Sequence, residues 1–310
     1  MRKWITAICI LGLGILEVFG QQDPQYTQYM YNTQVVNPAY VGSREALSFG
    51  ALYRTQWVGF EGAPKTGTFT VNSPIGAYDN MGLGLSIVSD KLGPATESNV
   101  NIDFAYALQV SANATLSFGV KAGIDILDVD YSLLDILDPT DEIFQTNIDN
   151  KLQPQIGTGV YFNTEKFYLG LSIPNFLETK HFDEGDLQNI TSESIAAERM
   201  HYFFITGYVF DISENLKFKP ATLVKIVSGA PVQWDFSANF LINEKFTVGA
   251  AYRWSAALSG LVGFQASDSV FIGFGYDYQT TDLEKYSDGS YEVMLRFEVF
   301  RNRVVAPRFF

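Results

Sequence analysis

The amino-acid sequence predicts an all-β fold, a transmembrane antiparallel β-barrel of about 14 strands. Three observations lead to this prediction. Apolar and polar residues alternate over segments of about ten residues, turn-forming residues separate the segments, and short and long connections follow one another in a regular order. A tilted strand of about 9–11 residues crosses a bilayer, and its lipid-facing and lumen-facing side chains alternate.

The alternation is clearest in residues 100–110, 231–240, 270–279 and 290–300. In 231–240, one face carries aromatic and aliphatic side chains, and the other face carries Gln233, Asp235, Ser237 and Asn239. An uncharged aromatic face opposite a small polar face suits lipid outside and an enclosed lumen inside. A two-sheet sandwich also alternates, but its strands are usually shorter, about 5–6 residues, and its outer face is solvated.

The same rule divides the chain into fourteen strand segments: 45–55, 65–74, 80–90, 97–110, 114–126, 153–162, 165–173, 199–210, 215–226, 231–240, 245–254, 256–265, 269–279 and 290–300. Connections after even-numbered strands are short and rich in turn formers. Every long connection follows an odd-numbered strand: 56–64, 127–152, 174–198 and 280–289. Outer-membrane barrels have short periplasmic turns and longer outer loops. An even strand count then places both termini in the periplasm.

The N-terminus predicts export from the cytoplasm. Arg2 and Lys3 precede the apolar run from Trp4 to Leu16, and a small residue, Gly20, follows at the end, which is the layout of a signal peptide over residues 1–20. A retained membrane anchor is the alternative, although the run is short for one. Cys9 is the only cysteine and would leave with this peptide, so neither disulfides nor a thiolate metal site is expected in the mature chain. We expect a periplasmic or plug segment over 21–44 and the outer-membrane barrel over 45–310.

The segment 21–44 is almost uncharged and rich in aromatic residues, in which disordered segments are normally poor. A disordered leader without a function is the alternative. Its tyrosines offer a large contact area with polar tips, which suits a barrel plug or a protein interface; they are Tyr26, Tyr29, Tyr31 and Tyr40. Asn37 and Pro38 predict a turn that leads into the first strand.

Arg54 falls on the lumen-facing side of the first predicted strand, followed by Gln56 and by Trp57 at the start of the outer loop. A lumenal arginine needs a carboxylate or backbone partner, so Arg54 could tether the plug. Trp57 is equally suited to the aromatic belt at the membrane surface. Other inward-facing charges of both signs, among them Asp277 and Glu292, could pair, hold the plug or line a pore. Gly82 and Gly273, each in a Gly-x-Gly pair, could let the strands curve or leave lumen space for a plug.

The net charge of −13 is concentrated in the predicted loops 127–152 and 174–198. It suits a solvated face that limits aggregation, or a divalent-cation site, and it argues against a nucleic-acid partner. The two histidines, His181 and His201, belong to no recognised catalytic or metal-binding motif. We therefore predict no catalytic residue, metal site or cofactor, although a Ser–His–Asp group assembled across the barrel wall is an alternative.

Three stretches, QYTQYMYNTQVVNPAYVGSR, YRTQWVGFEGAPKTGTF and GLGLSIVSDKLGP, resemble in fixed order the start of PorP/SprF proteins of the type IX secretion system of Bacteroidetes. The C-terminal APRFF resembles the family's aromatic ending. The matching positions are Gln28, Tyr29, Met30, Asn32, Asn37, Pro38, Ala39, Tyr40, Gly42, Tyr53, Arg54, Gln56, Trp57, Gly62, Ala63, Pro64, Gly82, Gly84, Asp90, Lys91, Gly93 and Pro94.

The resemblance implies a non-enzymatic outer-membrane component of the secretion and gliding machinery, which supports export or surface attachment of a specific adhesin or other cargo. The expected partners are secreted cargo, periplasmic or outer-membrane machine components and membrane lipids. The candidate plug or partner contacts are Tyr26, Tyr29, Tyr31, Asn37, Pro38, Tyr40, Arg54, Gln56, Trp57, Pro64 and Lys91. Two alternatives are a passive or fatty-acid-type transporter or porin, and an outer-membrane hydrolase that uses the histidines.

Overall fold

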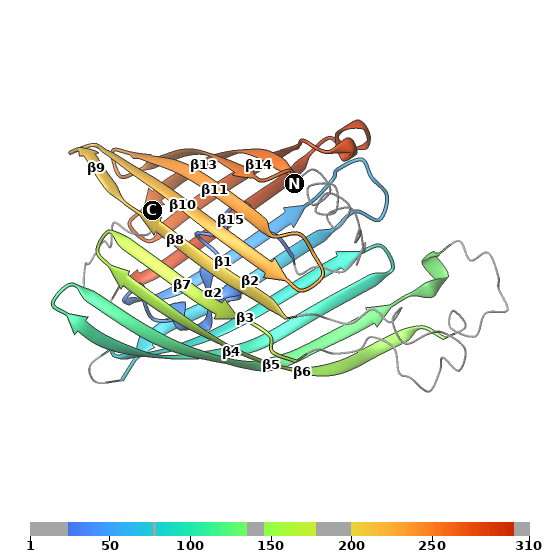
Figure 1. The fold of residues 1–310 in the computed structure, drawn as a ribbon, viewed down its shortest axis with the longest axis horizontal. Helices are drawn as coiled ribbons and strands as arrows, with labels where there is room; N and C mark the ends of the chain where they lie inside the picture. Colours follow the sequence, from blue (N-terminus) through green and yellow to red (C-terminus); the bar gives the residue numbers. More distant parts are fainter. Residues whose placement is uncertain (1–23, 77–78, 135–145, 178–199, 301–310) are drawn as a thin grey trace, which may run out of the picture.

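The computed structural model of the chain describes residues 24–76, 79–134, 146–177 and 200–300. These residues form a closed antiparallel β-barrel (Figure 1). Strands that follow one another in the chain pair with each other, except that β8 and β9 both pair with β10, and β1 pairs with β15 to close the wall. Closure leaves the wall without the free sheet edges that cannot be tolerated in a membrane.

The wall is made of β1 (Ala46–Thr55), β2 (Lys65–Ile75), β3 (Met81–Leu92), β4 (Ala95–Ser111), β5 (Ala114–Val129), β6 (Ile148–Thr164), β7 (Phe167–Ile173), β8 (His201–Tyr208), β9 (Phe210–Ser213), β10 (Leu216–Val227), β11 (Gln233–Ile242), β12 (Phe246–Arg253), β13 (Ala257–Ser267), β14 (Val270–Gln279) and β15 (Ser290–Phe300). Only Val209 separates β8 from β9, and both pair with β10. They are two parts of one strand, so the fifteen strands of the sheet form a fourteen-stranded barrel, as predicted.

The predicted loop 127–152 is wrong at both ends. β5 continues to Val129 and β6 begins at Ile148, so the two strands extend far past the other hairpins (Figure 1). Their pairing continues through Leu127 and Lys151, with a register shift just beyond, near Asn150, whose φ is 51°. Polar and acidic residues can extend a hairpin in water because the strands satisfy each other's backbone groups. Most of the predicted loop 174–198 lies outside the described residues.

The side chains are arranged as a bilayer requires. In β11, Trp234, Phe236 and Phe240 are exposed on the outer surface, whereas Asp235 and Ser237 are buried inside. Aromatic rings also line up between strands on the outer face, as in the stack of Phe210, Phe218 and Phe240. An apolar, aromatic exterior around a polar interior confirms a transmembrane barrel. Within the described residues, no helix is long and apolar enough to span a membrane.

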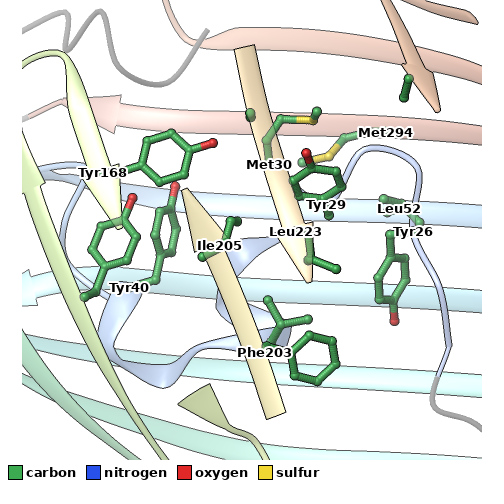
Figure 2. Packing of buried hydrophobic residues seen from close by; sticks show 14 of the residues in the cluster. Tyr26, Tyr29, Met30, Tyr40, Leu52, Tyr168, Phe203, Ile205, Leu223 and Met294 are labelled. Carbon is green, nitrogen blue, oxygen red and sulfur yellow. The ribbon is translucent and has the colours of Figure 1, made fainter. Parts of the chain in front are cut away.

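Residues 24–44, here called the lumenal segment, lie inside the barrel (Figure 1). The segment contains one short α-helix, α2 (Thr33–Val36), and a 3₁₀ turn, η1 (Pro38–Tyr40). Its buried side chains, among them Tyr29, Met30 and Tyr40, pack against wall residues such as Ile205 and Met294 (Figure 2). The hydrophobic core of this protein is therefore the contact between the segment and the inner wall.

Glycines in the wall allow this close approach. A Cβ atom on Gly119 of β5 would lie 2.2 Å from the backbone nitrogen of Ala39 and 2.5 Å from its Cα. A Cβ atom on Gly273 of β14 would lie 2.2 Å from Oε1 of Gln28. A Cβ atom on Gly82 of β3 would lie 2.1 Å from the carbonyl oxygen of Val41. At both Gly82 and Gly273, the absence of a side chain therefore leaves room for the lumenal segment. The wall is shaped to receive the backbone of the segment.

We predict that Gly119→Val destabilises the protein by about 1–3 kcal/mol, the usual cost of overpacking, because the new side chain meets backbone rather than flexible atoms. Gly260→Val is the matched control, since Gly260 of β13 is exposed and has no atom within 4 Å of its added Cβ. Chemical unfolding in detergent micelles, followed by tryptophan fluorescence, measures both. Equal stability of the two variants would contradict the close approach.

Candidate functional site: the lumenal segment and the barrel wall

The lumenal segment is folded locally by turns and by one capping asparagine. Asn37 is fully buried and precedes Pro38, which is the first residue of η1. Its Oδ1 accepts a hydrogen bond from the backbone N–H of Ala39 at 3.0 Å, and its Nδ2 donates to the carbonyl oxygen of Val160 at 3.1 Å. Asn37 and Pro38 thus form the expected turn, and the same asparagine joins that turn to β6.

An ionic cluster joins the start of the segment to the seam where the barrel closes. Nη2 of Arg54 lies 2.6 Å from Oδ2 of Asp277, and Nη1 lies 3.2 Å from Oε2 of Glu292. Nη1 of Arg54 also donates to Oγ1 of Thr27 at 2.7 Å. The two oxygens of Glu292 accept from the backbone N–H groups of Thr27 at 2.9 Å and Gln28 at 2.7 Å.

The charges of this cluster are buried almost completely, with 1% of the Arg54 side chain and none of the Glu292 side chain exposed. Buried charges are stable only when they are paired and hydrogen-bonded. Here Arg54 is shared by two carboxylates, and the backbone of the segment supplies further donors to one of them. The segment is therefore needed to satisfy these wall charges.

A second set of polar contacts holds the middle of the segment. Nε2 of Gln34 donates to the carbonyl oxygen of Leu85 and to Oδ2 of Asp103, both at 3.1 Å, and its Oε1 accepts from Asn72 at 2.9 Å. Nζ of Lys121 donates to the carbonyl oxygen of Val35 at 2.9 Å. The neighbouring wall strands β2, β3, β4 and β5 thus hold both side-chain and backbone groups of this part of the segment.

The tyrosines of the segment fill the remaining lumen space. The hydroxyl of Tyr29 lies 3.1 Å from Oγ of Ser237, and the ring of Tyr40 meets that of Tyr161 edge-on at 5.5 Å. The ring of Tyr31 lies 4.9 Å from that of Phe271. Burial raises the pKa of the Tyr31 phenol to about 12. The Tyr31 ring therefore acts as a neutral packing group at ordinary pH.

The structure brings most of the sequence-predicted site residues together. Tyr26, Tyr29, Tyr31, Asn37, Pro38, Tyr40 and Arg54 all line the interface between segment and wall. Gln56 lies at the edge, where its Oε1 accepts from Arg54 at 3.5 Å and its N–H donates to the carbonyl oxygen of buried Pro64. Trp57 begins the turn between β1 and β2, with φ of 46°, and its backbone N–H donates to Oγ of Ser290. Lys91 is exposed at the end of β3, away from this interface.

Sequence reasoning did not assign Thr27, Gln28 and Gln34 of the segment as contacts with the wall; all three are polar and uncharged, although Gln28 is among the positions that match the family. Asp277 and Glu292 were expected to face the lumen but were not assigned to Arg54. The pairing of Arg54 with Glu292 could have been predicted, because closure of a barrel pairs its first and last strands. In the observed register Arg54 lies directly opposite Glu292.

The histidines do not form a site in the described residues. His201 is buried at the start of β8, next to the ring of Phe203, and His181 lies outside the described residues. Within the described ranges, no group of three or more His, Cys, Asp or Glu side chains is placed to hold a metal ion.

Comparison with known proteins identifies a family to which the chain is similar. The family model described as "Type IX secretion system membrane protein PorP/SprF" matches residues 18–297. No curated protein matches the chain. Among solved structures, the CymD monoaromatic hydrocarbon channel is 11% identical, with a TM-score of 0.51 and coverage of 89% of this chain and 94% of that one.

Two further solved structures are similar in fold. A Pseudomonas aeruginosa FadL homologue is 12% identical, with a TM-score of 0.46 and coverage of 93% of this chain and 97% of that one. Omp33 of Acinetobacter baumannii is 8% identical, with a TM-score of 0.46 and coverage of 83% and 100%. At these identities, the likeness to CymD supports the barrel fold alone.

We predict that Arg54→Met lowers the free energy of unfolding by about 3–5 kcal/mol, the typical cost of leaving buried partners unpaired. Lys285→Met is the matched control, because the ion pair between Lys285 and Asp282 is exposed at the surface and contributes little. Urea titration in detergent micelles measures the two variants side by side. An Arg54→Met protein as stable as Lys285→Met would show that the cluster does not anchor the segment.

Proposed function

Because the chain belongs to the PorP/SprF family of type IX secretion system membrane proteins, we propose that it supports export or surface attachment of a specific secreted adhesin or other cargo. It is an integral outer-membrane protein, and its family implies contacts with other components of the secretion machinery. In this proposal the role is non-enzymatic and depends on protein–protein contacts, with both chain termini on the periplasmic side.

The observation that carries the proposal is the filled lumen. Thr27, Gln34 and Asn37 are buried and bonded to the wall, and the segment around them packs as a core would. A barrel filled in this way offers little open passage to a solute. It presents instead a rigid scaffold with partner surfaces at its two ends, including the long β5–β6 hairpin.

Passive transport is the second candidate. It is favoured by the many charged side chains that face the lumen, including Lys219, Arg253, Asp235 and Arg296, since a hydrated pore needs such a lining. The lumenal segment would then be the element that closes the pore. The two candidates differ in what the intact protein does when it is alone in a bilayer.

We expect a chain lacking residues 22–36 to insert into the outer membrane but to lose surface display of its cargo. Without the segment, Glu292 and Asp277 would be hydrated by lumen water, and the outer wall would be unchanged. The measurement is surface labelling of secreted proteins in a strain that carries this deletion, with heat-modifiable mobility as the control for a folded barrel. Normal display of every surface protein would contradict the proposal.

Isolation from detergent-solubilised membranes and planar-bilayer recording separate the two candidates. Export support predicts that a large secreted protein or a periplasmic component co-purifies with the intact chain, which itself conducts little current. Passive transport predicts steady conductance by the intact chain and no such partner. The second result would replace the proposed function with the transporter.

A further inference from the structure

The lumenal segment runs through the barrel in one direction, which its successive contacts with the wall define. The end of the barrel at which β1 and β14 finish and β11 and β15 begin is here called the outer mouth; the long β5–β6 hairpin extends from this end (Figure 1). The opposite end carries the short turns and is here called the periplasmic end. Because β1 begins at the periplasmic end, the chain ahead of it can either stay there or run back through the lumen.

The C-terminal end of the segment lies at the periplasmic end. Nη2 of Arg44 donates to Oε2 of Glu298 at 2.8 Å, two residues before β15 ends. The backbone of Val41 lies against Gly82, the second residue of β3. The segment therefore joins β1 at the end of the barrel that carries the short turns.

The middle of the segment contacts the middle of the wall. Nε2 of Gln34 donates to the carbonyl oxygen of Leu85, the fifth of the twelve residues of β3. The hydroxyl of Tyr29 lies 3.1 Å from Oγ of Ser237, the fifth of the ten residues of β11. Because β3 runs toward the outer mouth and β11 runs away from it, both contacts lie well inside the lumen.

The N-terminal end of the segment lies at the outer mouth. Nε2 of Gln25 donates at 2.7 Å to Oε1 of Gln233, the first residue of β11. The carbonyl oxygen of Tyr26 accepts at 3.5 Å from Nη2 of Arg253, the last residue of β12. Pro24 and Gln25 are partly exposed, whereas Tyr26 is buried. Exposure thus rises toward the outer mouth, as expected where the segment comes out of the lumen.

The two ends of the segment are separated by more than half of the membrane. Thr27 accepts a hydrogen bond from Arg54, near the end of β1. Glu298, the partner of Arg44, lies opposite Ser48, near the start of β1. Positions 48 and 54 are about 20 Å apart along the strand, at about 3.3 Å per residue. With a strand tilt of about 35–45°, this corresponds to about 15 Å across an apolar band that is about 25 Å tall.

Charged wall residues fix the direction of the segment. Near the outer mouth, Glu292 accepts from the backbone N–H groups of Thr27 and Gln28. Near the periplasmic end, Glu298 pairs with Arg44. A segment that left the lumen at the periplasmic end would deprive buried Glu292 of both donors, which is costly for a buried charge.

We propose that the lumenal segment presents its N-terminal end, Pro24 and Gln25, at the cell surface, within reach of a protein partner outside the cell. A periplasmic N-terminus follows from an even strand count only if the chain ahead of β1 stays at the end where β1 begins. The lumenal segment instead carries the chain back to the outer mouth, while β15 still ends at the periplasmic end. The inference does not rest on the role in export, because it concerns the course of the chain alone.

The test places an epitope tag at one of three positions and measures antibody labelling of whole cells. The tag is inserted directly before Pro24, after Ala112 in the turn between β4 and β5, or after Lys285 in the connection between β14 and β15. We expect the tags at Pro24 and Lys285 to be labelled on intact cells, and the tag at Ala112 only after the outer membrane is permeabilised. Heat-modifiable mobility shows that each barrel is folded. Labelling of the Pro24 tag only after permeabilisation, together with the Ala112 tag, would overturn the proposal.

A smaller change covers the case in which the tag before Pro24 disturbs the segment. In a chain carrying Cys9→Ser, Gln25→Cys places a thiol at the proposed end, and Asn113→Cys places one in the exposed turn between β4 and β5 as the matched control. We expect a membrane-impermeant maleimide to label residue 25 at least tenfold faster than residue 113 on intact cells. Equal labelling, or faster labelling of residue 113, would overturn the proposal. Surface display of cargo is measured separately, so failure of this proposal is distinguishable from failure of the export role.

Discussion

The structure depends on one constraint: a strand that crosses a bilayer must expose apolar side chains to lipid and turn its polar ones inward. In a barrel of this width the inward face is too polar to pack on itself. The lumenal segment fills the interior instead. It brings tyrosine rings to the inner wall, and it also brings groups that hydrogen-bond to the polar side chains of the wall. Wall and segment therefore form one folded unit, in which each satisfies groups that the other buries.

At the seam between β1 and β15, the side chains turned inward are charged and need partners. Closure of the barrel places Arg54 opposite Glu292, and Asp277 of β14 lies within reach of the same guanidinium. Neither carboxylate is fully satisfied by the arginine alone, and Thr27 and Gln28 supply the missing donors. Barrel closure and placement of the segment are thus coupled through a few buried atoms. This coupling explains how an almost uncharged segment is held by a highly charged wall.

Much of the barrel could be predicted from the sequence, because alternation with a period of two records directly which face each residue occupies. The strands around Trp234 and around Phe274 were found for this reason, and the order of short and long connections agreed with a count of about fourteen strands. The extension of β5 and β6 to Val129 and Ile148 could not be found in this way. Outside the bilayer, both faces of a hairpin are wet, so the alternation that marks a membrane strand is lost.

The site was predictable only in outline. Tyr29 and Arg54 stand out in the sequence by size or charge, but Thr27 and Gln34 are common polar residues whose importance depends on where the segment lies in the lumen. That position is set by contacts across the whole chain, such as Gln34 with Asp103, which no local pattern contains. Glycines such as Gly82 indicated spare lumen space without indicating which residue would fill it.

The most direct measurement of the central claim is the accessibility of the segment in the folded barrel. In a chain carrying Cys9→Ser, the variant Thr33→Cys places a thiol at a position that is 2% exposed, and Glu284→Cys places one at an exposed position. A segment held by the wall predicts rapid labelling of residue 284 by a water-soluble maleimide, and labelling of residue 33 only after unfolding. Equally rapid labelling of both in the folded protein would contradict the account.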